Sequence, residues 1–246
     1  LRSDRIAWGL HDPVAADMDV DLLQQTYLRR LRHHGGHISC EEAFVAGVSS
    51  AAGWRVKTSQ RELTCAVLVN AAGAWADDVA FKAGVAPLGL QPKRRTAALI
   101  EPPADPAFPT WPAVLDVEER FYFKPDAGLL LVSPAEETDV EPHDAQADDL
   151  ALAEGIERIS AVADIQVTRA PRAWAGLRTF APDRIPVIGP DSAAGGRFHW
   201  VAAQGGYGIQ TAPAAARLAA AMVGGGPLPD FADRTLLDAL APGRFR

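Results

Sequence analysis

The segment that decides the fold covers residues 200–213, with the sequence Trp-Val-Ala-Ala-Gln-Gly-Gly-Tyr-Gly-Ile-Gln-Thr-Ala-Pro. It begins with a short apolar run of strand type, continues through three glycines in four positions, and enters an alanine-rich helical pattern. Thr211 is a suitable N-cap, and Pro213 would then lie in the first turn, so the pattern predicts a helix that begins at Thr211. The order strand, glycine turn and helix is typical of a ligand-binding site.

The glycines of this turn are predicted to bring a ligand close to the backbone. Gly205, Gly206 and Gly208 have no Cβ, and the free N–H groups of the helix lie at its positive end. An electron-rich group is therefore the expected ligand. These residues alone leave one alternative open, which is a glycine-rich connection that only packs tightly.

The composition is that of a globular protein that acts on small molecules. Of the 246 residues 48% are hydrophobic, enough for a sizeable core, and the formal net charge of -7 argues against a nucleic-acid partner. Cys40 and Cys65 are the only cysteines and do not form a CxxC pair. We therefore expect free thiols and a cytoplasmic location.

A metal site is not predicted, although several potential ligands lie close together in the sequence. His33, His34, His37 and Cys40 lie on both sides of an expected helix end and of the Gly35-Gly36 break, so they share no fixed ligand face. Histidines at the C-terminus of a helix also interact favourably with its dipole.

The pattern of apolar runs and prolines predicts an α/β (α+β mixed) fold with an inserted domain. We expect residues 1–86 and 181–246 to form one domain, and residues 87–180, where proline is frequent, to form a second one on a mixed, largely antiparallel sheet. A strand at 63–72 is expected to be buried on both faces, as in a parallel sheet. Other strands are expected at 43–48, 54–58, 96–100, 120–124, 128–132, 165–168 and 185–189, with helices after Asp19 and around 152–159, and only the tail after Gly224 looks loose.

Four motifs in this order resemble the FAD-dependent D-amino acid oxidase superfamily, which includes glycine oxidase, sarcosine oxidase and D-amino acid dehydrogenases. They are residues 67–75, 173–178, 182–189 and the segment at 200–213. Within that superfamily, residues 90–95, 121–128 and 202–211 look most like bacterial D-arginine dehydrogenase. The resemblance implies FAD as the cofactor and a Rossmann-like FAD-binding domain, with the inserted domain holding the substrate.

The sequence departs from the superfamily pattern in one respect. The family opens with a strand, a GxGxxG turn and a helix that hold the FAD pyrophosphate, and this sequence contains no such turn. The FAD-binding domain is therefore expected to lack its first βαβ unit. Because the chain also begins at Leu1 without a methionine, we expect it to be a fragment of a longer protein or a truncated gene product.

The resemblance assigns two loops to the cofactor. The first loop contributes Ala71, Gly73 and Trp75, and the second contributes Gly205, Gly206, Tyr207, Gly208, Ile209, Gln210 and Thr211. As the flavin takes up a hydride, negative charge gathers at its N1–C2=O edge, where the positive end of the helix would stabilise it.

The resemblance also assigns residues to the substrate. Arg178 lies where the family places the arginine that binds the substrate carboxylate, and a guanidinium is well suited to that task. Arg95 and Tyr122 match further positions that face the carboxylate, and the Gly206 carbonyl would accept a hydrogen bond from the amino group. Arg94 competes with Arg95, because successive residues of a strand point to opposite faces. No catalytic residue is assigned, since substrate positioning and the cofactor account for the chemistry.

The predicted function is FAD-dependent oxidative deamination of D-amino acids to 2-oxo acids and ammonia through an imino acid. D-Arginine and other cationic or apolar D-amino acids are the candidate substrates. The electron acceptor is left open, with a peripheral membrane electron-transfer protein as one option. Two alternatives stand beside this reading: a glycine or sarcosine type of amine oxidase that uses O₂, and a non-catalytic truncated paralogue or subunit.

Overall fold

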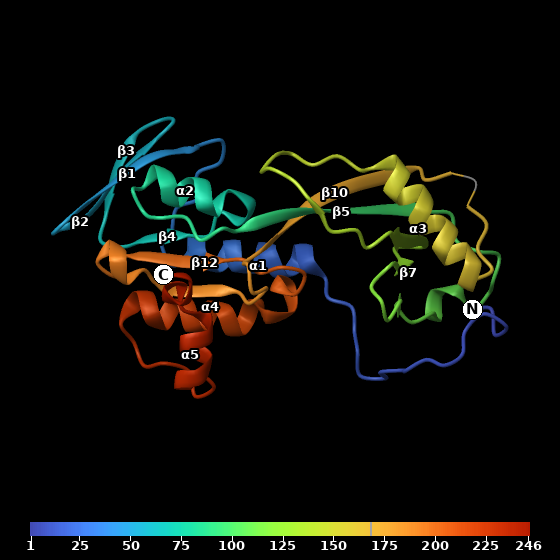
Figure 1. Cartoon of the computed structure of the whole chain (residues 1–246). Coiled ribbons are helices and arrows are strands. Elements are labelled where there is room, and N and C mark those ends of the chain that lie inside the picture. The colour runs from blue at the N-terminus through green and yellow to red at the C-terminus, as the bar shows by residue number, and fades with distance from the viewer. Residues whose placement is uncertain (168) are drawn as a thin grey trace. The chain divides into compact units, whose positions relative to one another are not determined.

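The computed structural model describes residues 1–167 and 169–246, which form two compact units (Figure 1). One unit contains residues 1–10 and 91–180, and the other contains residues 11–90 and 181–246. The mixed α/β class predicted from the sequence is confirmed. The assignment of one domain to FAD and the other to the substrate stays a prediction.

The unit formed by residues 1–10 and 91–180 is built on an antiparallel sheet in the order β10-β5-β8-β7-β6, with β9 also paired to β5. The expected hairpin is confirmed as β7 and β8, joined by Ala127 and Gly128 with φ of 47° and 82°, as a tight two-residue turn requires. The strand expected at 165–168 reaches a residue outside the described part of the chain, and residues 165–167 are not in a strand. The strands are β5 (Gln91–Ile100), β6 (Val114–Leu115), β7 (Tyr122–Asp126), β8 (Leu129–Ser133), β9 (Thr138–Asp139) and β10 (Arg172–Phe180).

Helix α3 (Asp149–Val162) covers one face of this sheet. It begins at the N-cap Asp148, whose carboxylate accepts a hydrogen bond from Ala151 N at 2.9 Å. Leu152 and Ile159 lie on its inner side and pack against buried residues of the sheet, including Phe123. Each such side chain contributes roughly 1.5–3 kcal/mol through burial. This helix was predicted from the same apolar spacing.

The unit formed by residues 11–90 and 181–246 contains two three-stranded sheets, in the orders β1-β2-β3 and β11-β12-β4. The first sheet is antiparallel, whereas β12 and β4 of the second run parallel. Its core is aromatic, with the ring of Phe198 between those of Trp54 and Trp200 at 5.8 and 5.3 Å. The strands are β1 (Phe44–Ser50), β2 (Gly53–Thr58), β3 (Glu62–Cys65), β4 (Leu68–Asn70), β11 (Val187–Pro190) and β12 (Phe198–Ala202).

Four helices complete this unit: α1 (Val20–His33), α2 (Ala76–Lys82), α4 (Gly208–Gly224) and α5 (Arg234–Leu240). The predicted cap of α1 is confirmed, because Asp19 accepts a hydrogen bond from Leu22 N at 2.8 Å. Short 3-10 turns lie at Gly73–Trp75, Phe108–Thr110, Ser192–Ala194 and Pro242–Phe245, the second of them in the other unit. Among the described residues, none of the helices is both long and apolar enough to cross a bilayer.

The prediction of one doubly buried strand at 63–72 is wrong. The chain forms two short strands there, β3 in the antiparallel sheet and β4 in the parallel pair, and Val69 in β4 is 42% exposed. A continuous apolar run cannot show that the chain leaves one sheet at Cys65 and joins another at Leu68.

The prediction of a loose tail after Gly224 is also wrong. Helix α5 is capped by Asp233, and two arginines near the end of the chain make ion pairs with distant carboxylates. Arg244 Nε lies 2.7 Å from Asp183, and Arg246 Nη2 lies 2.7 Å from the buried Asp191. These partners lie more than fifty positions earlier, so no local pattern reveals them.

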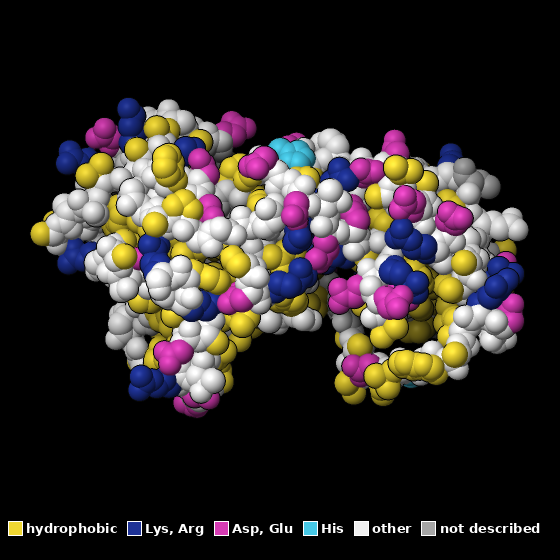
Figure 2. All heavy atoms as spheres, in the orientation of Figure 1, with side chains coloured by type: hydrophobic (Ala, Val, Ile, Leu, Met, Phe, Trp, Pro, Cys, Tyr) yellow, Lys and Arg dark blue, Asp and Glu magenta, His cyan; other side chains and the backbone are white. Residues whose placement is uncertain are grey.

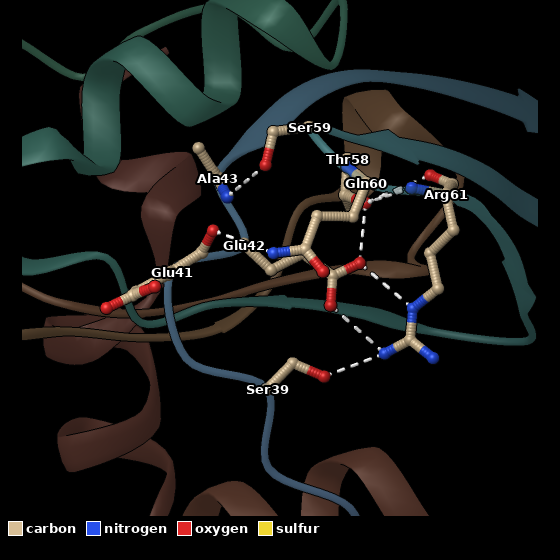
Figure 3. A network of polar contacts seen from close by, with 8 residues as sticks. All are labelled: Ser39, Glu41, Glu42, Ala43, Thr58, Ser59, Gln60 and Arg61. Atoms are coloured by element: carbon tan, nitrogen blue, oxygen red, sulfur yellow. Dashed lines mark hydrogen bonds and ion pairs between the residues drawn. The ribbon is translucent and has the colours of Figure 1, made fainter.

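A polar network ties the segment after α1 to the turn between β2 and β3 (Figure 3). Arg61 donates two hydrogen bonds to Glu42, at 2.9 and 3.0 Å, and a third to the Ser39 hydroxyl at 2.7 Å. The Thr58 hydroxyl donates to the same carboxylate at 2.6 Å. The bonds from Arg61, followed by that from Thr58, lower the pKa of Glu42 to about 2. We interpret this network as structural.

Candidate functional site

The sheet of the first unit carries two arginines on the face opposite α3. In the antiparallel pair of β5 and β10, Gly176 lies opposite Arg95 and Arg178 lies opposite Lys93. Because residues two apart on a strand share a face, Arg95 and Arg178 are diagonal neighbours on one face, with Cα atoms roughly 7–8 Å apart. A Cβ built on Gly176 would meet nothing within 4 Å. The face is therefore open between the two guanidinium groups.

Tyr122 belongs to the same face. It lies opposite Ser133 in the β7–β8 pair, and the register of β8 on β5 aligns Ser133 with Ala97, two residues from Arg95. The Tyr122 side chain is half-buried and acts electrostatically on Arg95. The structure thus brings together three of the four predicted substrate residues. Gly206, the fourth, belongs to the other unit.

The two guanidinium groups on this open face lack sufficient anionic partners. Arg95 is only 9% exposed, its Nη2 donates to Glu137 Oε1 at 3.2 Å, and its buried Nε has no hydrogen-bond partner among the described residues. Burial, followed by the positive charge of Arg178, lowers the pKa of Arg95. Within the described residues, no carboxylate forms an ion pair with Arg178. An anion bound here would satisfy the free donor and offset the repulsion.

Arg94, the competitor of Arg95, lies on the α3 side of the sheet. It forms an ion pair with Asp148, the N-cap of α3, and its Nε lies 3.9 Å from Glu136. Glu136 also accepts a hydrogen bond from Thr96 N at 2.6 Å. Two carboxylates therefore neutralise Arg94, and its position is explained by the attachment of the helix. Its buried Nε, like that of Arg95, has no hydrogen-bond partner among the described residues.

Sequence reasoning did not identify Glu137 as part of the arginine face. One signal was present: two adjacent glutamates follow β8, and two adjacent arginines lie in β5. Because side chains alternate between the faces of a sheet, each glutamate meets a different arginine. Locating that contact requires the sheet register, which the sequence does not contain.

The second unit presents a different candidate site, at the edge where the parallel strands β4 and β12 end. The buried Asn70 at the end of β4 shapes the following loop, since its amide donates to Ala76 O at 2.7 Å and accepts from Ala72 N at 3.3 Å. The three residues predicted to contact the cofactor, Ala71, Gly73 and Trp75, are all exposed on this loop. Gly73 has φ of 56° and open space where a Cβ would lie.

The loop after β12 leads into α4, and here the predicted helix start is wrong. The N-cap is Tyr207 and not Thr211, so Pro213 lies inside the helix and leaves the Ile209 carbonyl without its usual i+4 donor. The Thr211 hydroxyl instead donates to Tyr207 O at 2.9 Å.

Tertiary contacts explain why the helix begins earlier than the capping preferences indicate. The Tyr207 hydroxyl donates to Arg184 O at 2.8 Å, which fixes the residue before the first turn. A Cβ on Gly208 would lie 2.8 Å from Gln204 Cβ, so this close turn requires glycine. With Gly205 at φ of 55°, the glycines do adopt the tight turn that was expected.

The first turn of α4 offers backbone donors to a ligand. The N–H groups of Gly208, Ile209 and Gln210 have no acceptor within the helix, because a helical N–H bonds to the carbonyl four residues earlier and the helix has not yet begun there. None of the side chains that the structure describes caps them, and the first turn contains no acidic residue. Gly206, Ile209, Gln210 and Thr211 are exposed, and the intervening Tyr207 and Gly208 are half-buried. Uncapped donors at the positive end of a helix suit an electron-rich group.

The described residues show no group of three or more His, Cys, Asp and Glu side chains able to hold a metal ion. His33 and His34 are in edge contact at 5.3 Å, and Cys40 and Cys65 are free thiols.

The chain belongs to the DAO family of FAD dependent oxidoreductases, because the model of that family matches residues 1–222. Members of this family depend on FAD. Hydrogen cyanide synthase subunit HcnC from Pseudomonas protegens is 25% identical over 176 residues, which cover 70% of this chain and 36% of that protein. FAD-dependent oxidoreductase domain-containing protein 1 from Bos taurus is 29% identical over 178 residues. The match covers 65% of this chain and 36% of that protein. This chain therefore spans about a third of the length of these curated relatives.

Solved structures share the fold. L-proline dehydrogenase from P. horikoshii has a TM-score of 0.75 at 19% identity, with 91% of this chain and 59% of that one covered. Glycine oxidase from Geobacillus kaustophilus has a TM-score of 0.71 at 19% identity, with 84% and 54% covered.

The residues of the β4–β12 edge fit one end of FAD. The uncapped donors of α4 suit the electron-rich edge of a flavin, and the exposed loops after β4 and β12 contain glycines at which a flat ring can approach the backbone. A GxGxxG turn for the pyrophosphate does not occur in this sequence. The fit therefore concerns the flavin end of the cofactor.

Proposed function

We propose that this chain carries the substrate site and the flavin end of the cofactor site of an FAD-dependent D-amino acid dehydrogenase. The observation that supports this most is the open face of the antiparallel sheet, where Arg178 and the unsatisfied Nε of Arg95 lie on either side of the open position at Gly176. Such a face suits a carboxylate, which every amino acid carries.

In the proposed complex, Arg178 and Arg95 donate hydrogen bonds to the substrate carboxylate. Paired guanidinium groups hold the plane of a carboxylate by charge-assisted bonds, and burial strengthens those bonds. The Tyr122 hydroxyl adds a further donor, and the Gly206 carbonyl accepts from the amino group. Binding of this kind fixes the orientation of the substrate Cα, which is the main contribution of the protein to the rate.

FAD, when bound, accepts the hydride that leaves the substrate Cα. The residues proposed to hold its flavin end are Ala71, Gly73, Trp75, and Gly205, Gly206, Tyr207, Gly208, Ile209, Gln210 and Thr211. The first turn of α4 would stabilise the negative charge of the reduced cofactor. The imino acid released from the site is hydrolysed by water to a 2-oxo acid and ammonia.

The choice of D-amino acids over other amines rests on a resemblance to bacterial D-arginine dehydrogenase, which is carried by residues 90–95, 121–128 and 202–211. A glycine or sarcosine type of oxidase is the second candidate, and the fold shared with glycine oxidase supports it. The two candidates differ in substrate and in electron acceptor, since an oxidase transfers its electrons to O₂.

Reduction of the flavin under anaerobic conditions tests the proposal. The full-length protein, loaded with FAD, is mixed with D-arginine, D-alanine, glycine or sarcosine, and the loss of oxidised flavin absorbance is followed. Reduction by D-amino acids, with little hydrogen peroxide formed in air, supports the dehydrogenase. Reduction by glycine or sarcosine with stoichiometric peroxide supports the oxidase. A protein that retains flavin but is reduced by none of these amines would contradict both.

A further inference from the structure

The open face continues along β10 beyond the two arginines, and the next side chain on it is aromatic. Because residues two apart on a strand share a face, Trp174 follows Arg178 and Gly176 on this side of the sheet. The residue is 40% exposed and belongs to none of the core clusters that the described residues form. Packing of the core therefore does not account for a tryptophan at this position.

The location of Trp174 is more informative than its exposure. Figure 2 shows apolar side chains scattered among charged ones over the visible face of the molecule, so an exposed apolar residue is not unusual by itself. In the β5–β10 pair, however, Trp174 is the diagonal neighbour of Arg95, and Gly176 separates it from Arg178. An aromatic ring thus borders the proposed anion site.

The surface between Trp174 and the arginines has room for a ligand. A Cβ built on Gly176 would meet nothing within 4 Å, and the residue opposite Trp174 on β5 is Ala97, which has a small side chain. Two residues along a strand span roughly 7 Å. This is about the length of an amino acid of phenylalanine size. Such a ligand, with its carboxylate between the arginines, would extend over Gly176 to Trp174.

The Trp174 ring already has one flat group beside it. The guanidinium carbon of Arg172 lies 5.9 Å from the ring centroid, within the range of a cation–π contact. Arg172 precedes Trp174 on this face of β10, whereas Gly176 follows it and contributes no side chain. Toward Gly176, a second aromatic ring could therefore pack against Trp174 in an offset or edge-to-face arrangement.

The geometry points to Trp174 as the residue that determines specificity for the substrate side chain, selecting aromatic side chains over saturated ones of the same size. The inference rests on the proposed function, because it requires that a carboxylate binds between Arg95 and Arg178. An aromatic pair is stabilised beyond the burial of its area, whereas an ordinary apolar surface favours the larger apolar area of a saturated ring. The direction of the preference therefore separates stacking on Trp174 from general hydrophobic contact. The substrate class is D-amino acids with aromatic side chains.

Binding of three carboxylates tests the role of Trp174. Phenylpropanoate and cyclohexylpropanoate share a carbon skeleton and differ in the aromaticity of the ring, and succinamate is a small ligand with one carboxylate and no ring. Dissociation constants are measured on the full-length, FAD-loaded protein labelled with ¹⁵N-arginine, from the Nε–H signals of Arg95 and Arg178. We expect wild type to bind phenylpropanoate about 2- to 10-fold more tightly than cyclohexylpropanoate. A smaller preference, or the opposite one, would overturn the inference.

Substitution of the ring sharpens the test. In Trp174→Leu, the preference for phenylpropanoate should disappear, while the affinity for succinamate should stay near wild type. Trp174→Phe keeps an aromatic ring and should retain the preference. Trp8→Leu, which removes a tryptophan that is 73% exposed in the same unit, is the matched control and should also retain it. An unchanged preference in folded Trp174→Leu would contradict the role of Trp174.

Arg178→Ala separates this inference from the proposed function. If the variant and wild type bind succinamate equally, or if wild type binds none of the three ligands, the anion site itself is wrong and the selectivity falls with it. If succinamate binding requires Arg178 while the preference for phenylpropanoate does not depend on Trp174, the site stands and only the role of Trp174 is refuted.

Discussion

Two adjacent arginines of β5 enter opposite environments, and the two faces of the sheet differ accordingly. On the α3 face, Arg94 contacts Glu136 and the N-cap Asp148, in the layer where the helix packs. On the open face, Arg95 and Arg178 repel each other, and Glu137 is the carboxylate paired with Arg95. Among the described residues, both faces contain an arginine whose buried Nε has no hydrogen-bond partner, so the faces differ in their charge balance. The difference supports the proposal that strand alternation assigns stability to one face and ligand binding to the other. Substitutions on the two faces should therefore have separable effects.

The largest effect is expected from Arg178→Lys on the open face. Lysine keeps the charge but loses the planar fork, which leaves the bound carboxylate poorly paired. In the FAD-loaded protein, kcat/KM for a D-amino acid should fall by about 30- to 5000-fold, or roughly 2–5 kcal/mol. The melting temperature and flavin content should stay near wild type.

Arg172→Lys is the matched control, since Arg172 is exposed on the same strand and face. A fully active Arg178→Lys protein would remove Arg178 from the site. The same holds if activity is lost only because the protein unfolds.

The next largest effects are expected from two glycine substitutions, one on each face, which should change stability and ligand binding separately. In α3, a Cβ on Gly155 would lie 2.6 Å from Pro134 Cα, so Gly155→Ala forces the helix from the sheet. Overpacking costs about 1–3 kcal/mol, and the better helix propensity of alanine returns up to about 1 kcal/mol. We expect the free energy of unfolding, measured in urea, to fall by a net amount of about 1–2 kcal/mol. The folded protein should still bind succinamate, a small ligand with one carboxylate.

Gly176→Ala should weaken ligand binding and leave stability nearly unchanged, because its Cβ enters the open space between Arg95 and Arg178. Stability should stay within about 0.5 kcal/mol of wild type, as is usual at exposed positions. The affinity for succinamate should fall. Equal effects of the two alanines on stability would contradict the division between faces.

The neighbouring arginines offer a smaller but closely matched contrast. Arg94→Gln leaves Glu136 and Asp148 without their cation, and we expect a loss of about 1–2 kcal/mol in the free energy of unfolding. Arg95→Gln should cost less or stabilise the fold, because its lowered pKa means that folding disfavours the charged form. Unfolding in urea gives the first comparison. Succinamate titration should give the opposite order, with Arg95→Gln the weaker binder.

The smallest effect is expected in the pH dependence of stability on the α3 face. The hydrogen bond from Ala151 N, aided by the charge of Arg94, lowers the pKa of Asp148 in the folded state. A carboxyl with a lowered folded pKa stabilises the protein above its unfolded pKa, near 4, and loses that contribution as the pH falls further. Glu42 in the other unit acts in the same direction.

Because Glu42 contributes as well, the contribution of Asp148 to the free energy of unfolding is measured by comparing wild type with Asp148→Asn. In unfolding experiments between about pH 5 and pH 3, Asp148→Asn should lose less stability than wild type as the pH falls. Asp149→Asn, which makes the same charge change one residue along α3, should follow wild type. Parallel curves for wild type and Asp148→Asn would rule out this coupling.

Elements governed by local periodicity were predictable from the sequence. The β7–β8 hairpin, α3 with Leu152 and Ile159, and the Asp19 cap of α1 all follow from patterns within about a dozen residues. The alternation of Arg94 and Arg95 was likewise foreseeable, since it depends only on strand geometry.

Features set by distant contacts were not predictable. The start of α4 depends on Tyr207 bonding to Arg184 and on the approach of Gly208 to Gln204, which override the capping preference of Thr211. Glu137 lies 42 positions from Arg95 in the chain, so only the sheet register reveals their contact. The division of residues 63–72 between two sheets has the same cause.

The pairing of β4 with β12 has a consequence for synthesis on the ribosome. Leu68 pairs with Phe198, and all of residues 91–180 are translated between them. The antiparallel unit can assemble as soon as β10 emerges, whereas the edge proposed for the flavin cannot form before β12 is made. Strands β1, β2 and β3 can pair with one another early, but β4 must wait for β12 with its backbone edge unpaired, a state that exposes a nascent chain to aggregation and to chaperones. Slow codons or mutations that delay residues 198–202 would therefore lower the yield of folded protein without altering any residue that contacts the substrate.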